Sequence, residues 1–261
     1  MNFKNLSILT LLAALSFSFA SCSDDDDKKE TAENYYFLPT EVKSVTASYA
    51  STLEYNAERQ IVKYVNSYTD EGELYTTTTI TYTGGKPAKI VSQSNEEGEE
   101  TPRTTLIAYN GNTVTLTKGE EVTTITINDK DCILESIDEY NNITTFEYDA
   151  ASRISKVNNN GYVSTYTNDD KNGIFKDVNL PQWFLYVLGD EDPFFFNKIN
   201  NVLVETEYNN AGDKVSSVTT NTFTYNDAGF PKKADIKYEF KSKPDENENE
   251  SINITYKTIK K

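Results

Sequence analysis

The chain has 261 residues, a net charge of −16 and no histidine. This length suffices for one all-β domain. The acidic balance argues against nucleic acid and anionic membrane surfaces as partners, because like charges repel. Without histidine, Ser-His, Cys-His and histidine-containing zinc sites are excluded. We therefore predict no enzyme, no cofactor and no metal.

Residues 1–21 are predicted to be a signal peptide. Lys4 precedes an apolar run, Leu6 to Ala20, that is short for a membrane span. The run ends in Ala-Ser-Cys22, which resembles a bacterial lipobox with Phe19 in place of the usual leucine. The resemblance implies that Cys22 is acylated and becomes the mature N-terminus. The alternative is ordinary secretion with an incidental cysteine.

An acidic run follows Cys22 directly: it consists of Ser23, Asp24, Asp25, Asp26 and Asp27. Adjacent carboxylates repel one another and resist burial, so residues 22–34 are predicted to form a flexible acidic tether. The run also resembles the export signal of Bacteroidetes lipoproteins that are sent to the cell surface. That resemblance implies a lipid anchor in the outer membrane, with the protein facing the cell exterior.

Removing the signal peptide takes away one lysine and no acidic residue, so the mature charge becomes 24 − 41 = −17. The mature chain holds two cysteines, Cys22 and Cys132. If Cys22 is acylated, Cys132 has no partner for an intrachain disulfide. Its apolar neighbours predict a buried, inert thiol.

A short pattern recurs along residues 35–261. An aromatic residue ends an alternating run, Asn or Asp follows, then small polar residues, then an apolar residue opens the next run. Copies include "LEYNAERQIVKYV" from Leu53, "FEYDAASRISKV" from Phe146 and "FTYNDAGFPKKADI" from Phe223. Asn and Asp can bond their own backbone, and Gly supplies positive φ. Each copy is therefore predicted to turn a β-hairpin, with Tyr, Ile and Val on one face and Thr, Lys and Glu on the other.

These copies resemble the Tyr-Asp repeats of large bacterial surface and toxin-shell proteins. Tyr148, Asp149, Arg153 and Ile154 fit that pattern, whereas Ser152 stands where Gly is expected. The resemblance implies a shared hairpin architecture and no shared function. We predict an all-β fold: an antiparallel meander of repeated hairpins that forms a curved sheet, open or partly closed, in one domain over residues 35–261.

The pattern is interrupted by an aromatic-rich insert at about residues 174–200. The surrounding text, with Asp170, Lys171, Asn172 and Phe175, resembles a stretch in uncharacterised Bacteroidetes surface lipoproteins that carry such repeats. That family implies no activity for this chain.

The segment "LPQWFLYVLG" predicts a short helix between Pro181 and Gly189. One interpretation is a plug that completes the core. The other is an aromatic platform for a glycan or peptide. The candidate ligand-binding residues are Trp183, Phe184, Tyr186, Phe194 and Phe195.

Residues 168–173, "NDDKNG", partly match a calcium-binding loop. The closing bidentate Glu is missing, because Asn179 stands at that position. A structural turn is the preferred interpretation.

Three functions remain open from sequence. The first is a surface lipoprotein that binds a glycan or a protein. The second is a periplasmic structural or chaperone-like lipoprotein that holds an apolar guest. The third, and least favoured, is a glycosidase that uses two carboxylates. The membrane, reached through the anchor, is a partner in each case.

Overall fold

The structure is a computed structural model that describes residues 34–68, 74–96, 101–189, 198–209, 212 and 214–261. The chain divides into two compact units, residues 1–31 and 32–261. The first lies outside the described residues, and with it the predicted signal peptide, Cys22, the run Ser23–Asp27 and most of the tether. Phe194 and Phe195 also lie outside them.

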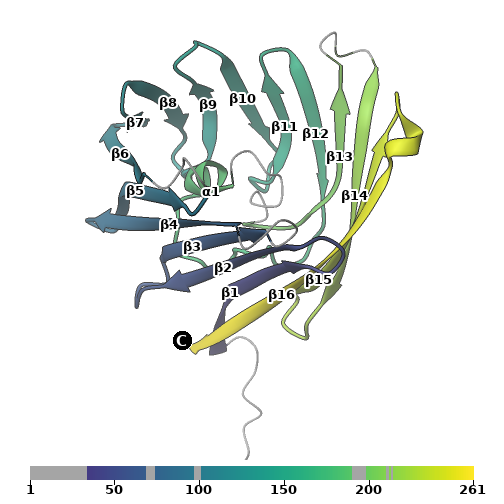
Figure 1. The fold of residues 1–261 in the computed structure, drawn as a ribbon, viewed down its shortest axis with the longest axis horizontal. Coiled ribbons are helices and arrows are strands. Elements are labelled where there is room, and N and C mark those ends of the chain that lie inside the picture. Colours follow the sequence, from purple (N-terminus) through teal and green to yellow (C-terminus); the bar gives the residue numbers. More distant parts are fainter. Residues whose placement is uncertain (1–33, 69–73, 97–100, 190–197, 210–211, 213) are drawn as a thin grey trace, which may run out of the picture. The chain divides into compact units, whose positions relative to one another are not determined.

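The described residues of the second unit form sixteen antiparallel strands, a short α-helix and a 3-10 turn (Figure 1). In chain order they are β1 (Tyr35–Ser44), β2 (Tyr49–Tyr55), β3 (Ile61–Tyr68), β4 (Leu74–Thr83), β5 (Lys86–Ser94), β6 (Arg103–Asn110), β7 (Thr113–Lys118), β8 (Glu121–Ile127), β9 (Ile133–Ile137), β10 (Ile143–Tyr148), β11 (Ile154–Asn159), β12 (Tyr162–Asn168), α1 (Gln182–Leu188), β13 (Val202–Tyr208), β14 (Val215–Tyr225), β15 (Pro231–Phe240), η3 (Pro244–Glu246) and β16 (Glu248–Lys260).

The all-β hairpin meander is confirmed, but the prediction of an open or partly closed sheet is wrong. The strands close into a barrel, because β1 pairs with β16 from Tyr35↔Lys260 to Ser44↔Ile252. All other neighbours in the barrel are consecutive in sequence. The closing pair joins the two ends of the domain, so no local pattern could reveal it. Closure also leaves no exposed sheet edge, which removes a template for aggregation.

The repeated turns share one geometry. In the β10–β11 turn, Asp149 Oδ1 accepts hydrogen bonds from the backbone N–H of Ala151 at 2.9 Å and of Arg153 at 3.0 Å. Asn226 does the same for Ala228 and Phe230, each at 3.0 Å. The Asx side chain thus shapes the turn, as the sequence indicates.

The left-handed residue of each turn is the third after the Asx residue. These residues, with φ between 57° and 78°, are Arg59, Asp131, Asn141, Ser152, Gly212 and Gly229. Ser152 therefore occupies the left-handed position that glycine fills in the β14–β15 turn.

Alternate hairpins of a meander lie at the same end of a barrel. We call the end with the β2–β3, β8–β9, β10–β11 and β14–β15 turns the closed rim, and the opposite end the mouth rim. Tyr35 and Lys260 pair at the closed rim, so the described chain both begins and ends there.

The segment between β12 and β13 crosses the closed rim and is tied to its turns. The backbone N–H groups of Asn172, Asn179 and Trp183 donate to three carbonyls at 3.0–3.1 Å. The acceptors belong to the left-handed residues Gly229, Arg59 and Asp131, respectively. The turn geometry thus does more than reverse the chain: it presents carbonyls that hold the insert.

Helix α1 then lies inside the barrel (Figure 1). Trp183 and Phe184 are fully buried, and they join one core cluster with inward residues of the strands such as Ile61, Ile125 and Phe146. The predicted helix and the plug interpretation of its aromatic residues agree with this packing. The half of the lumen nearer the closed rim is therefore filled by apolar side chains.

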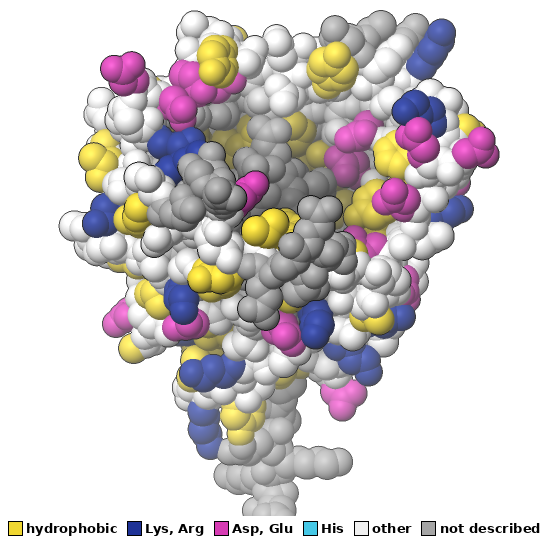
Figure 2. Space-filling view, viewed as in Figure 1, with side chains coloured by type: hydrophobic (Ala, Val, Ile, Leu, Met, Phe, Trp, Pro, Cys, Tyr) yellow, Lys and Arg dark blue, Asp and Glu magenta, His cyan; other side chains and the backbone are white. Residues whose placement is uncertain are grey.

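The outer wall is mostly polar, with the exposed apolar side chains of Leu106, Val122 and Ile143 among its polar residues. Thr79 and Thr81 flank the inward Ile80, and comparable threonines flank inward residues on other strands. Cross-strand ion pairs also lie outside, including Lys63 Nζ–Glu54 Oε1 at 2.9 Å and its counterpart Lys156–Glu147 at 2.8 Å. In Figure 2 charged side chains of both signs are spread over the visible face.

Among the described residues, no helix is long and apolar enough to cross a membrane.

Candidate binding site at the mouth of the barrel

The half of the lumen nearer the mouth rim is lined by polar and aromatic side chains. Inward positions here carry Thr, Ser, Asn, Tyr and Glu instead of the Ile and Val found nearer the closed rim. Three pockets of about 360, 510 and 300 Å³ lie there. Tyr186 and Val187, near the end of α1, each line two of them. Among the described residues, apolar side chains thus fill the lumen on one side of the helix, and these pockets lie on the other.

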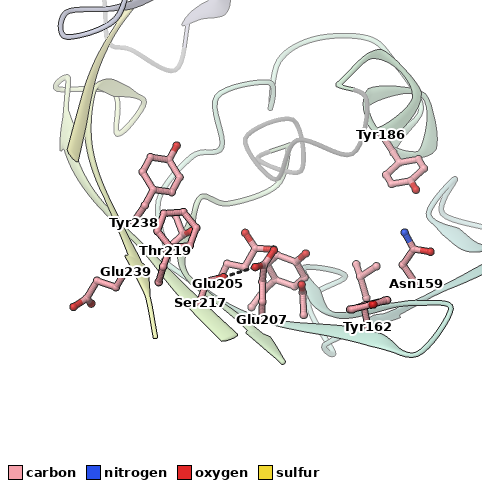
Figure 3. A pocket seen from close by; sticks show the side chains of 13 residues that line it. Asn159, Tyr162, Tyr186, Glu205, Glu207, Ser217, Thr219, Tyr238 and Glu239 are labelled. Carbon is pink, nitrogen blue, oxygen red and sulfur yellow. Dashed lines mark hydrogen bonds between the residues drawn. The ribbon is translucent and has the colours of Figure 1, made fainter. Parts of the chain in front are cut away.

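The pocket of about 360 Å³, which we call the tyrosine–glutamate pocket, lies between β11, β12, β13, β14, β15 and α1 (Figure 3). Its described lining residues are Val157, Asn159, Tyr162, Ser164, Tyr166, Tyr186, Glu205, Glu207, Ser217, Thr219, Tyr238, Glu239 and Phe240.

Two carboxylates enter this pocket from β13. Glu205 and Glu207 occupy alternate positions, so both side chains leave the same face of the strand. Glu205 is only 8% exposed and is hydrogen-bonded to the Tyr166 hydroxyl. Glu207 accepts a hydrogen bond from the Ser217 hydroxyl on the neighbouring strand.

The Tyr166 hydroxyl is held protonated. Burial, and next the charge of Glu205, raise the pKa of Tyr166 well above its ordinary value. On β15, the Tyr238 side chain faces the pocket (Figure 3). Phenols and carboxylates side by side can donate to and accept from a polar ligand, while the ring faces can stack on it.

Glu239 lies at the edge of the pocket, but its carboxylate points away from the other side chains (Figure 3). It pairs instead with Lys237 Nζ at 3.2 Å. This residue therefore marks the boundary between the lumen and the outer wall.

The residues proposed from sequence fall into two groups. Trp183 and Phe184 are 0% exposed, so the platform interpretation is wrong for these two side chains. Tyr186, at 9% exposure, lines the pocket and packs edge-on against Phe146 at 4.9 Å between ring centroids. The positions of Phe194 and Phe195 stay undescribed.

Sequence reasoning missed Glu205 and Glu207. The alternation rule placed glutamates on the outer face, with Val and Tyr inside. In β13, however, the glutamates face the lumen. The β12–β13 pair has a register shift between Thr167 and Asn168, and a shift of this kind changes which side chains face inward. A bulge of this kind leaves no signature in a single sequence.

Asp169, in the calcium-like stretch, bonds within the protein. Its carboxylate accepts from Asn201 N and Nδ2, each at 2.9 Å, and from the Tyr225 hydroxyl. These bonds fasten the two ends of the insert, as a structural turn requires. Across the part of the chain that the structure describes, no group of three His, Cys, Asp or Glu side chains could hold a metal ion.

Cys132 is 1% exposed, as predicted for a buried thiol. Its Sγ lies 3.3 Å from Gln182 Oε1 at the start of α1, and burial raises the pKa of the thiol.

Several solved structures are similar to the chain, including the following two. One is a porin-like protein from Bacteroides uniformis, with a TM-score of 0.42 and 14% identity over 85% of this chain and 96% of that one. The other is a porin-like protein from Bacteroides vulgatus, with a TM-score of 0.43 and 16% identity over 85% and 99%. Neither similarity is close enough to indicate what this chain binds. No family model and no curated protein matches the sequence.

Proposed function

We propose that this protein is a lipid-anchored outer-membrane lipoprotein that presents its barrel to the cell exterior and binds a polar ligand, a glycan in the first instance, at the mouth of the lumen. The observation that carries the proposal is the divided lumen. Apolar side chains fill the half nearer the closed rim, whereas hydroxyl, carboxylate and aromatic groups line the hollow half.

The direction of the chain supports the orientation of the mouth. The described chain enters the barrel at the closed rim, at Tyr35. A tether that ends in an acylated Cys22 would hold that rim toward the membrane. The mouth rim, at the other end of the strands, would then face away from the membrane, where a large ligand could reach it.

The outer wall favours display in water over insertion in lipid. Barrels that span a membrane carry an outward apolar band, and a lysine at the lipid midplane costs about 2–4 kcal/mol. Here threonines and ion pairs such as Lys63–Glu54 occupy outward positions along the strands. The predicted lipid on Cys22, and not the strands, would therefore make the membrane attachment.

Localisation is tested by metabolic labelling with palmitate and by protease treatment of intact cells. We expect the wild-type chain to incorporate label and to be digested without lysis, and Cys22→Ala to lose the label. Protection in intact cells, with digestion after lysis, would reject surface display.

Ligand binding is tested by screening the mature protein on a glycan array. We expect hits that weaken at least tenfold in Tyr238→Ala, which removes a ring from the pocket wall. Tyr140→Ala is the matched control, because this tyrosine is 77% exposed in the β9–β10 turn. Hits that both variants retain would place the binding surface elsewhere.

The glycosidase alternative also has to be tested. Such an enzyme needs at least two acidic side chains that face one cavity. Glu205 and Glu207 supply that pair. Incubating the glycans that bind with wild-type protein and with Glu207→Gln decides it. Turnover that the variant loses would establish an enzyme, and we expect none. The chaperone-like alternative fits less well, because an apolar guest would meet a wall of hydroxyls and carboxylates.

A further inference from the structure

The side chains of the tyrosine–glutamate pocket indicate the charge of the ligand that it would bind. This inference rests on the proposed function. The pocket carries the carboxylates of Glu205 and Glu207. None of its described lining residues is a lysine or an arginine. A partly enclosed cavity with carboxylates and low-dielectric walls concentrates a negative potential. The mature chain adds a negative background, at −17 overall. An anionic ligand is therefore disfavoured here.

Aromatic rings form much of the remaining wall. Tyr162 and Tyr166 come from β12, Tyr186 from α1 and Tyr238 from β15, and all four line the pocket that the glutamates enter. Figure 3 shows Tyr162, Tyr186 and Tyr238 around this space. The face of a tyrosine ring attracts a cation through its quadrupole. Burial keeps the Tyr166 phenol neutral, so its hydroxyl remains a hydrogen-bond partner of Glu205. Carboxylates and tyrosine faces together are the surroundings that ammonium groups prefer.

The neighbouring pocket provides an internal comparison. The cavity of about 510 Å³ on the other side of α1 is lined by Arg103, Lys118, Glu121 and Glu139. Lys118 Nζ lies 3.0 Å from Glu121 Oε2. That wall is of mixed charge and holds no tyrosine among its described residues. Of these two pockets, the tyrosine–glutamate pocket is the one whose described lining combines carboxylates and tyrosines without a lysine or an arginine.

We propose that the tyrosine–glutamate pocket binds an ammonium group on its ligand. The nitrogen would donate to Glu205 and Glu207, while the tyrosine faces would contact the carbon atoms next to it. An amino sugar and a polyamine could each supply this group, and the chemistry of recognition is the same for both.

The test is calorimetric titration of the mature protein with three probes. These are a glucosamine oligomer, the N-acetylglucosamine oligomer of the same length, and spermidine. We expect the glucosamine oligomer to bind at least tenfold more tightly than its acetylated counterpart, because acetylation removes the charge and leaves the ring unchanged. Raising the salt concentration should weaken this binding. Spermidine that binds as tightly as the glucosamine oligomer would identify a polyamine as the source.

Variants locate the effect. Glu207→Gln should cost at least tenfold in affinity for the charged probe, whereas Glu239→Gln should leave it unchanged, because Glu239 points out of the lumen and pairs with Lys237. Equal binding of the two oligomers by the wild-type protein would overturn the inference. This comparison uses no variant, so it does not depend on whether a variant folds. If neutral glycans bind in a Tyr238-dependent way and charged ones gain nothing, the inference fails and the proposed function stands. Failure of every probe and every glycan would reject both.

Discussion

At the scale of single residues, the repeated turn does two things. Its Asx side chain organises the reversal, and its left-handed residue offers a carbonyl to the insert, as Arg59, Asp131 and Gly229 do. Partly buried tyrosines reinforce the barrel in a similar way. The hydroxyl of Tyr55 donates to Pro39 O at 2.5 Å, and that of Tyr82 donates to Ile61 O at 2.6 Å. The repeat thus fixes hydrogen bonds between neighbouring hairpins as well as within each one.

The β10–β11 turn should be less stable than the β14–β15 turn, because Ser152 occupies the left-handed position that Gly229 occupies there. The φ of 63° at Ser152 places a Cβ in a region that costs a non-glycine residue about 1 kcal/mol or more. Ser152→Gly is expected to raise the free energy of unfolding by about 0.5–1 kcal/mol. The reciprocal Gly229→Ser, at φ 78°, should lower it by a similar amount. Urea unfolding of the two variants measures both effects, and changes of the same sign would contradict the account.

Lys198 should make stability depend on pH. Burial lowers the pKa of its ammonium group to about 8, and its Nζ donates to the carbonyls of Val178 and Leu180. In the unfolded chain the pKa is about 10.4. Between these values the unfolded state binds more protons, so stability rises with pH. We expect a gain of about 1–2 kcal/mol from pH 7.5 to 9.5.

Above about pH 10 the direction should reverse. Burial raises the pKa of Tyr109 to about 12, so the unfolded chain releases that proton first and stability falls. Urea unfolding across pH 7.5–11 measures the whole curve. Lys198→Gln should remove the rise and keep the fall. An unchanged rise in this variant would assign it to another group.

At the scale of elements, α1 sets the depth of the lumen. Trp183 lies edge-on to Tyr109 at 6.1 Å and to Phe184 at 5.4 Å between ring centroids, in full burial. Trp183→Ala should therefore cost about 3–5 kcal/mol, since the cavity left in a closed barrel cannot collapse easily. Thermal unfolding measures it, with the exposed Tyr140→Ala as control. A loss no greater than that of the control would show that the helix is not part of the core.

The sequence predicted these elements unevenly. Hairpins, the helix and its buried tryptophan follow from local rules, because turn chemistry and the flanking Pro181 and Gly189 act over a few residues. Closure by β1 and β16 and the inward turn of Glu205 do not follow. The first depends on residues more than 200 positions apart, and the second is accompanied by a register shift that only the paired strands reveal. The candidate site consequently escaped prediction, apart from Tyr186.

At the scale of the whole domain, one face of the sheet builds a core and a cavity, and the other faces solvent. The insert divides the lumen, so the closed rim supplies stability and the mouth rim supplies polar chemistry. If Cys22 is acylated as proposed, the tether would join the membrane to the closed rim, and the mouth rim would be the end left open to a ligand. This arrangement requires that the outer wall be compatible with water.

That requirement is tested by light scattering during size-exclusion chromatography of the lipid-free chain, residues 23–261, in buffer without detergent. The threonines and ion pairs of the outer wall predict a folded, monodisperse species that does not associate with added lipid vesicles. Aggregation that only detergent relieves, or spontaneous insertion into the vesicles, would mean that the wall faces lipid and would contradict the account.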